Sequence, residues 1–212
     1  MIVPPAYELL RYEENYRYLQ DLTAQTDFWD PVKYIPLGDD PGTYLSFGGE
    51  LRERFEYYST PGFGLLGAKT DDYLLHRLLL HADLHVGDNF RTFAQFGNHL
   101  QAGKNTVSPI HVDRLDLQQG FVDIRLPIAP ASDIDPTLRG GRQEMAFGSQ
   151  RLVAVRDAPN VRRTFDGLRL GDTIDDIRID GFVTRPVLLK RAFSMTSRIT
   201  TRRSGVSIAP CR

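Results

Sequence analysis

The segment from Tyr44 to Tyr58 alternates between apolar and polar side chains, and this alternation constrains the fold more than any other feature of the chain. Its two parities carry Leu45, Phe47, Leu51, Phe55 and Tyr57 against Ser46, Glu50, Arg52, Arg54 and Glu56. Successive side chains of a β-strand point to opposite faces of the sheet, so the segment predicts a strand with one oily and one charged face. The same contrast returns in later segments, which is typical of a barrel whose interior holds water.

Turn signals divide the rest of the chain into further short segments. Seven strands are predicted, at 44–58, 73–86, 89–101, 115–126, 138–154, 161–170 and 176–186. Short strands between regular breaks indicate an all-β sandwich or barrel. The segment 73–86 also fits a helical stripe of leucines, but the short turn that links it to 89–101 favours a hairpin. The faces of 161–170 stay unassigned because both carry an arginine.

Composition and charge exclude several classes of protein. The 212 residues include 26 basic and 27 acidic side chains, so no overall field attracts nucleic acid. The single cysteine, Cys211, gives neither a disulfide framework nor a cysteine metal site. No apolar run reaches the length of about 18 residues that a membrane helix needs. The first twenty residues lack the apolar core of a secretory signal, so for a barrel we expect that the start of the gene product is missing or was assigned too late.

The two ends of the chain differ from the middle. Residues 1–43 combine a stretch of helical spacing with a proline-rich loop, and we interpret them as a periplasmic lead-in segment. Residues 44–187 hold the predicted strands. Residues 188–212 contain six basic and no acidic side chains, and we interpret them as a basic tail outside the barrel, disordered or out of frame.

Other candidate sites have ordinary explanations. His81, Asp83 and His85 alternate along one strand, too far apart for all three to reach one metal ion without a bulge, so pore-lining residues are the simpler interpretation. No nucleophile elbow, P-loop or dinucleotide fingerprint is present. We therefore predict no enzyme activity, no cofactor and no metal. Local packing is expected for Trp29, and an interfacial aromatic girdle is expected for the strand-end tyrosines Tyr44, Tyr57, Tyr58 and Tyr73.

Seven segments together resemble the alginate-export family of Gram-negative outer-membrane β-barrel proteins. In chain order they are DFWDPVKYIPLG (27–38), YLSFGGELRERFEYY (44–58), FRTFAQFGNHLQ (90–101), LDLQQGFVDIRL (115–126), LRGGRQEMAFGSQRLV (138–153), NVRRTFDGLRL (160–170) and IDGFVTRPV (179–187). The similarity covers residues 7–187. It implies an antiparallel transmembrane β-barrel in the cell outer membrane. Seven strands fall below the minimum of about eight for a closed barrel, so we interpret the chain as an incomplete one.

The resemblance also implies a lumen that passes an anionic polysaccharide or small anionic solutes. Its expected partners are that ligand, outer-membrane lipid and periplasmic export components, without nucleic acid. Carried onto these strands, the lining residues are Arg52, Arg54, Arg77, Arg91, Arg125 and Arg142, with Glu50, Glu56, Asp83, Asp123 and Glu144 to offset their charge. Guanidinium groups fork onto carboxylates, which suits repeated weak capture of a polyuronate. The alternative interpretation is a solvated face of exposed ion pairs, worth about 0–1 kcal/mol each.

Two other functions remain open at this point. The first is a soluble all-β carbohydrate-binding module, in which the oily faces would form the core of a sandwich. The second is a truncated product without function. The position of the oily faces separates the module from the channel, because only the module buries them against another layer of protein.

Overall fold

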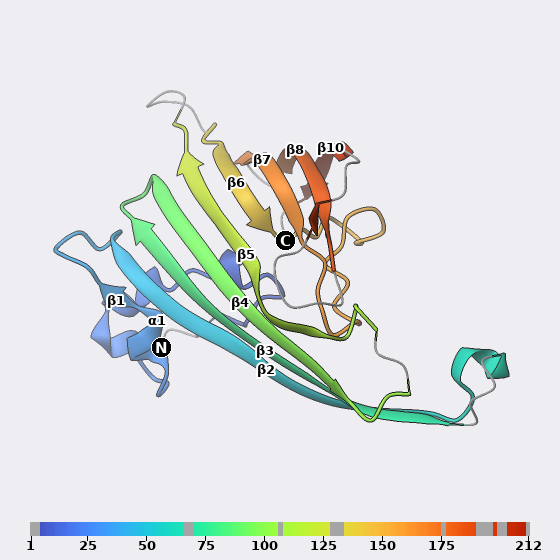
Figure 1. Cartoon of the computed structure of the whole chain (residues 1–212). Helices are drawn as coiled ribbons and strands as arrows, with labels where there is room; N and C mark the ends of the chain where they lie inside the picture. The colour runs from blue at the N-terminus through green and yellow to red at the C-terminus, as the bar shows by residue number, and fades with distance from the viewer. Residues whose placement is uncertain are drawn as a thin grey trace.

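A computed structural model describes residues 5–65, 70–105, 108–127, 134–174, 177–189, 197–198 and 203–210, with the last two segments as backbone only. It is mostly β: one antiparallel sheet whose strands follow chain order from β1 to β8 and then β10, while β9 also pairs with β8 (Figure 1). The strands are β1 (Ile35–Pro36), β2 (Tyr44–Tyr58), β3 (Asp71–Val86), β4 (Phe90–Ala102), β5 (Asp113–Arg125), β6 (Thr137–Gln143), β7 (Phe165–Ile174), β8 (Ile177–Leu188), β9 (Ser197–Arg198) and β10 (Arg203–Pro210).

Helical structure in the described chain is limited to single turns. These are the 3-10 turns η1 (Arg11–Glu13), η2 (Arg17–Gln20), η3 (Leu22–Ala24) and η4 (Pro61–Gly64), and the one-turn helix α1 (Asp30–Lys33). None of them has the length or the apolar character to cross a membrane. The expected helical spacing in the lead-in therefore appears only as 3-10 turns.

Most predicted strands are confirmed within two residues. β2 has the predicted bounds, and 73–86 is the strand β3 rather than a helix. The predictions for 138–154 and 161–170 were wrong at their ends, because β6 stops at Gln143 and β7 starts at Phe165. Residues 144–164 between them, here called the inner loop, leave the sheet. Positive φ values at Gln150 (56°) and Arg156 (55°) are incompatible with an extended ladder.

Within the described residues, the sheet contains eight strands of seven or more residues, one more than predicted. The additional strand is β10, which pairs with β8 from Arg203 opposite Thr184 to Pro210 opposite Ile177. It lies in the basic tail, where the sequence reads GVSIA and alternates only weakly. The sheet does not close, since its path ends at β1 on one side and β10 on the other.

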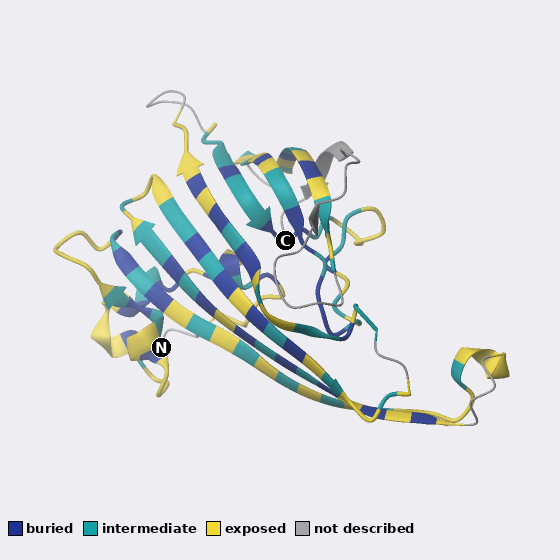
Figure 2. Ribbon diagram, in the orientation of Figure 1, coloured by how far each residue is buried: buried dark blue, intermediate teal, exposed yellow. Residues whose placement is uncertain are grey.

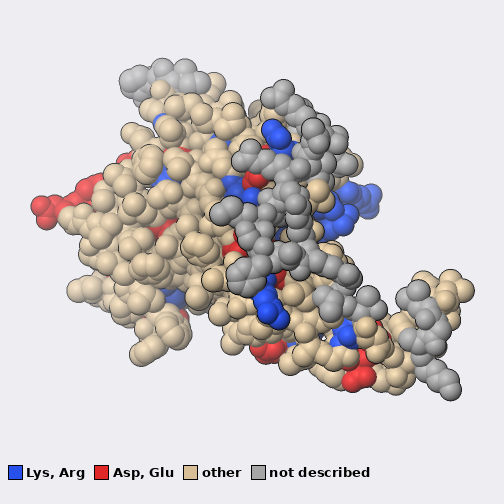
Figure 3. Space-filling view, viewed as in Figure 1, with Lys and Arg blue, Asp and Glu red and all other residues tan. Residues whose placement is uncertain are grey.

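The two faces of the sheet reverse the pattern of a soluble protein. The apolar side chains form the outer face, where Leu51, Phe55 and Leu80 are 66%, 68% and 57% exposed. Polar side chains form the inner face, where Arg77 is fully buried. This alternation gives the striped pattern along the strands in Figure 2, and Figure 3 shows few charged atoms over β2–β5. No second layer of the described chain covers the oily side chains, so they are not the core of a sandwich.

The inner face is covered by the lead-in and the inner loop. One small core joins the lead-in residues Leu10 and Tyr12 to the strands and the loop through Phe93, Phe121 and Val155. A second core joins the lead-in to the start of β2, through Tyr16, Leu19, Tyr34 and Tyr44. Hydrophobic packing therefore exists in this molecule, but on the side of the sheet that carries the charges.

The aromatic predictions divide into two groups. Tyr44 and Tyr73 are buried on the inner face, so the girdle predicted for them was wrong, whereas Tyr57 and Tyr58 are exposed. Tyr44 instead stacks on His85 with ring centroids 4.4 Å apart. Trp29 packs edge-to-face against Phe28 and remains 59% exposed.

Candidate functional site

Arg77, in the middle of β3, attaches the inner loop to the sheet. Its Nε donates to the carbonyl of Asn160 (2.8 Å), and its Nη2 donates to the carbonyls of Asp157 (3.0 Å) and Pro159 (2.8 Å). Its Nη1 donates to the carboxylates of Asp157 (2.7 Å) and Glu50 (3.1 Å). All five hydrogen bonds come from one fully buried side chain, which is therefore not exposed to a solute.

Asp157 is the centre of charge in the inner loop. Besides Arg77, it accepts a hydrogen bond from Arg162 Nε at 2.8 Å and one from Arg52 Nη1 at 3.3 Å. Desolvation by burial acts to raise the pKa of Asp157, but the hydrogen bonds and charges of Arg77 and Arg162 outweigh it and lower the pKa to about 2. The carboxylate therefore stays ionised at neutral pH and holds three arginines around it.

The loop is also fixed to the sheet by Asn160. This buried amide donates from Nδ2 to the carbonyls of His76 (2.8 Å), Leu100 (3.2 Å) and His111 (3.0 Å). Arg54 adds a bond to the carbonyl of Ala158 at 2.6 Å. The inner loop is thus held on the inner face of the sheet by neutral and charged groups together.

Glu144 is buried where the inner loop leaves β6. Its carboxylate accepts from Gln118 Nε2 at 3.0 Å and lies 3.7 Å from Arg162 Nη1. Burial raises the pKa of this group. Gln118 reaches it because β5 contains a bulge: Gln95 pairs with Gln119 and Phe96 pairs with Leu117, which leaves Gln118 as the extra residue. Gln118 and Gln119 therefore both face inward.

Near the opposite end of the strands, three arginines pair with aspartates of neighbouring strands. This is the turn end, where residues 87–89 and 126–136 connect the strands. Arg91 on β4 donates to Asp83 on β3 at 2.6 and 2.8 Å, and Arg139 on β6 donates to Asp123 on β5 at 2.7 and 2.8 Å. Arg169 on β7 donates to Asp180 on β8 at 2.7 Å. These cross-strand pairs fix the direction of each guanidinium on the inner face.

The lead-in inserts Tyr12 among these arginines. Its ring lies 4.1 Å from the guanidinium carbon of Arg139 and makes edge-to-face contacts with Phe93 and Phe121. Its hydroxyl donates to the carbonyl of Glu144 at 2.8 Å, and its own carbonyl accepts from Arg91 Nη2 at 2.6 Å. One lead-in residue therefore contacts the sheet and the inner loop together.

A cavity of about 760 Å³ lies beside Tyr12, between the lead-in and the turn ends of β3–β8. Acidic lead-in side chains and five arginines of the sheet line it. These groups are Glu8, Glu13 and Glu14 on one side and Arg91, Arg125, Arg139, Arg169 and Arg178 on the other, where Asp123, Asp135 and Asp172 also line the cavity. The volume is in the range that holds a small ligand of a few rings.

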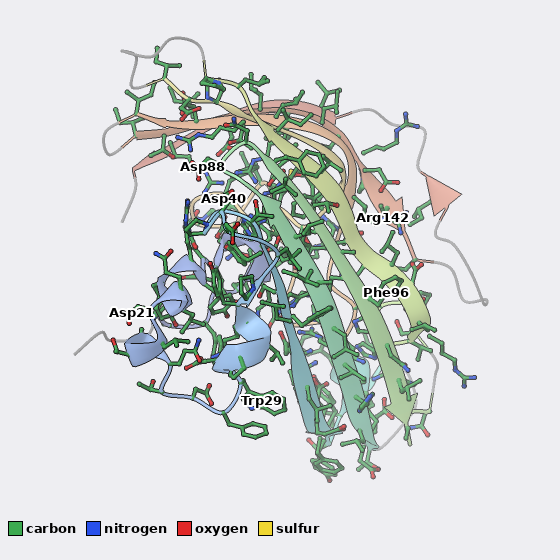
Figure 4. The ribbon with its side chains drawn as sticks, turned by 90° about the vertical axis from the view of Figure 1, so that its left-hand side faces the viewer. Asp21, Trp29, Asp40, Asp88, Phe96 and Arg142 are labelled. Carbon is green, nitrogen blue, oxygen red and sulfur yellow. The ribbon has the colours of Figure 1, made fainter. Side chains whose placement is uncertain are left out.

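The predicted lining residues lie in different parts of this arrangement. Arg142 is on the outer face instead, opposite Gly120, and its Nε donates to Asp166 at 2.9 Å. Figure 4 shows Arg142 and Phe96 on the side of the sheet away from the lead-in that carries Asp21. Its Gly-Gly strand has no alternation from which to assign a face. The other predicted residues are on the inner face, in three places. Those under or beside the inner loop are Glu50, Arg52, Arg54, Arg77 and Glu144, and Glu56 is near the loop end of β2. Those at the turn end are Asp83, Arg91, Asp123 and Arg125.

Several functional residues were not predicted from the sequence. Arg139 was assigned to no face, and Arg169 lies in 161–170, whose faces were left unassigned. Arg162 lies in a part of the inner loop that was predicted as strand, and Asp157 lies between two predicted strands. The available signal was the turn DAPN at 157–160, which marks a break between the predicted strands 138–154 and 161–170. No group of three histidine, cysteine, aspartate or glutamate side chains in the described segments is placed to hold a metal ion.

Comparison with known proteins gives one match. The sequence model of a family described as alginate export matches residues 43–209. The match begins after most of the lead-in and continues past residue 187 into the basic tail. No curated protein and no solved structure matches the chain.

Proposed function

Because the chain belongs to the alginate export family, which is a transport family and not an enzyme family, we propose that it forms the wall of an outer-membrane channel for an anionic polysaccharide or small anionic solutes. The observation that carries this proposal is the reversed polarity of the sheet. The sheet of a soluble protein exposes its charged side chains and buries its apolar ones, whereas a membrane barrel with a water-filled lumen has apolar side chains outside and polar ones inside.

The length of the apolar band on the outer face supports the proposal. On the loop side, outward polar pairs interrupt the apolar area: Glu53 with His76 on β2 and β3, and Arg142 with Asp166 on β6 and β7. Phe55, Tyr57 and Leu74 lie beyond the first pair. From the first pair to the turn end, β3 presents Leu78 to Val86, a stretch of nine residues. A tilted strand needs about 9–11 residues to cross a bilayer. The other outward side chains of this band include Phe47, Leu51, Phe90, Phe96, Val122, Ile124, Leu138, Leu168, Leu170, Ile179 and Val183.

The inner face supports an anionic ligand. Five arginines line the cavity at the turn end together with six carboxylates, three of which belong to the lead-in, and permanently charged guanidinium groups recognise carboxylates in a bidentate manner. The carboxylates among them lower the net charge, which keeps binding weak enough for release. Barrels of this type have their short turns on the periplasmic side, so the cavity would receive ligand, and periplasmic export components, from there.

The free edges of the sheet define what else the channel needs. Only two residues of β2 pair with β1, which leaves the rest of that edge without a strand partner in the described chain. Unpaired backbone groups are not tolerated in lipid. The described strands therefore form an arc of the wall, and further strands must pair with β2 and β10 to close it.

Planar-bilayer recording tests the proposal directly. The protein is reconstituted, and the reversal potential is measured across a KCl gradient before and after addition of a uronic-acid oligomer. We expect anion-preferring conductance that the oligomer blocks and a neutral glucose oligomer of equal length does not. Cation preference, or no conductance from protein that has inserted, would remove the transport function.

A further inference from the structure

The lead-in places its own acidic groups among the arginines of the sheet. The stretch from Tyr7 to Tyr16 reads YELLRYEENY, with three glutamates and one arginine. Glu13 lies 3.4 Å from Arg178, and the backbone carbonyls of Tyr12 and Leu9 accept from Arg91 and Arg162 at 2.6 and 3.4 Å. The segment therefore offers the arginines the oxygen acceptors that a polyuronate would offer.

One arginine donor beside the lead-in has no acceptor. Arg139 is 8% exposed and lines the cavity, and its Nη1 makes no hydrogen bond within the described structure. A buried guanidinium donor without a partner is costly, and a ligand oxygen in the cavity would supply one. The Tyr12 ring covers the face of the same guanidinium at 4.1 Å, so the lead-in limits access to it.

We propose that residues 7–16 act as an internal pseudo-ligand: an anionic sugar chain binds in the cavity at the turn end, pairs with Arg139 and displaces the lead-in from the arginines of the sheet. This proposal rests on the proposed function, because it names how the same lumen is closed and opened. The cavity accepts the first uronate unit beside Tyr12. Further units then take over the contacts that Arg91 and Arg178 make with the lead-in.

Limited proteolysis of the full chain in detergent tests the displacement. Trypsin cleaves after Arg11 and Arg17. In the bound lead-in, Nη1 of Arg11 forms an ion pair with Oε1 of Glu14 at 2.6 Å, which restrains the cleavage site. A uronic-acid trisaccharide should accelerate cleavage at Arg11 at least fivefold, whereas a neutral glucose trisaccharide at equal ionic strength should not. A uronate that binds without changing this cleavage rate would overturn the proposal.

Affinity measurements with two lead-in variants provide the second test. Glu13→Gln weakens one partly exposed ion pair, so the trisaccharide should bind about two- to fivefold tighter. Tyr12→Ala removes the ring from Arg139 and should tighten binding more than about tenfold. The matched control is Glu53→Gln, which makes the same charge change on the outer face and should leave affinity unchanged. Equal effects of Glu13→Gln and Glu53→Gln, or weaker binding by both lead-in variants, would contradict the competition.

The outcomes separate this inference from the channel function. Uronate-dependent release of the lead-in by a protein without conductance would refute the channel and leave the pseudo-ligand in place. Anion-preferring conductance with no effect of Glu13→Gln and Tyr12→Ala on uronate affinity would do the reverse.

Discussion

Replacement of Arg77 by methionine should release the inner loop while the sheet persists. Methionine keeps most of the side-chain volume but removes all five hydrogen bonds to residues 157–160 and Glu50. Removal of one partner from a buried ion pair costs about 3–5 kcal/mol. At about 1.4 kcal/mol per factor of ten, the released fraction of the loop should rise by about a hundred- to several-thousand-fold.

Amide hydrogen exchange measures this release at defined positions. The amide of Val161 donates to the carbonyl of Ile110 at 2.9 Å, and the amide of Arg163 donates to that of Val155 at 2.6 Å. Both should lose protection in Arg77→Met, whereas amides inside β7 and β8 should keep theirs. Arg151→Met is the matched control, since this arginine is exposed in the same loop. A rise below threefold at Val161 and Arg163, or an equal rise across the whole sheet, would show that Arg77 does not act as the anchor of the loop.

Three further predictions concern the loop, the outer face and the backbone. Because the folded pKa of Asp157 is about 2, below the unfolded value of about 3.9, its stabilising charge is fully present above pH 4 and is lost as pH falls toward 2. Protection of the Val161 amide, measured by a pulse of hydrogen exchange at each pH, should therefore persist down to pH 4 and be lost as pH falls toward 2, and Asp157→Asn should remove the protection at every pH. Leu80→Arg should lower the stability of protein folded in vesicles by about 2–4 kcal/mol in urea titrations, whereas a change within about 0.5 kcal/mol would place this face in water. Gly141→Ala should destabilise by about 1–3 kcal/mol or more, since its φ is 136° and a Cβ would lie 2.3 Å from the Gly120 carbonyl oxygen; Gly181→Ala, with open space around it, should not shift the unfolding midpoint.

Local alternation was sufficient to predict β2 and β3, which precede the bulge in β5. β2 and β3 pair residue by residue without interruption, so their period of two persists from end to end and fixes both the bounds and the faces. In β5 the extra residue Gln118 shifts the parity halfway, which is why Leu117 blurred the first half of that segment. A bulge is a property of a strand and its partner, and a single strand does not show where it lies.

The inner loop could not be predicted because its cause is not local. The sequence divides 144–164 between the predicted strands 138–154 and 161–170, with a turn signal between them, and gives no local reason for either strand to leave the sheet. Arg77 and Asn160 are 83 positions apart, and the contact between them decides the path of the loop. Pairing of this kind is determined by the curvature of the sheet, which brings the inner faces of β3 and the loop together.

The position of the inner loop decides which arginines are available to bind an anionic ligand. The sequence placed Arg77 among the lining residues and gave Arg139 no role, but their surroundings sort them differently. Arg77 has acceptors for all of its donors, whereas Arg139 keeps one nitrogen without an acceptor in the described structure. An arginine whose hydrogen bonds are complete holds the protein together, and its replacement should change stability more than selectivity. An arginine with an unpaired donor in a cavity is a candidate to bind the ligand. Substitution of Arg139 by lysine should therefore weaken uronate binding with little loss of stability. Arg77→Lys should lower stability with little change in uronate binding. Equal changes in stability and in affinity for the two variants would show that burial and pairing do not decide the role of these side chains.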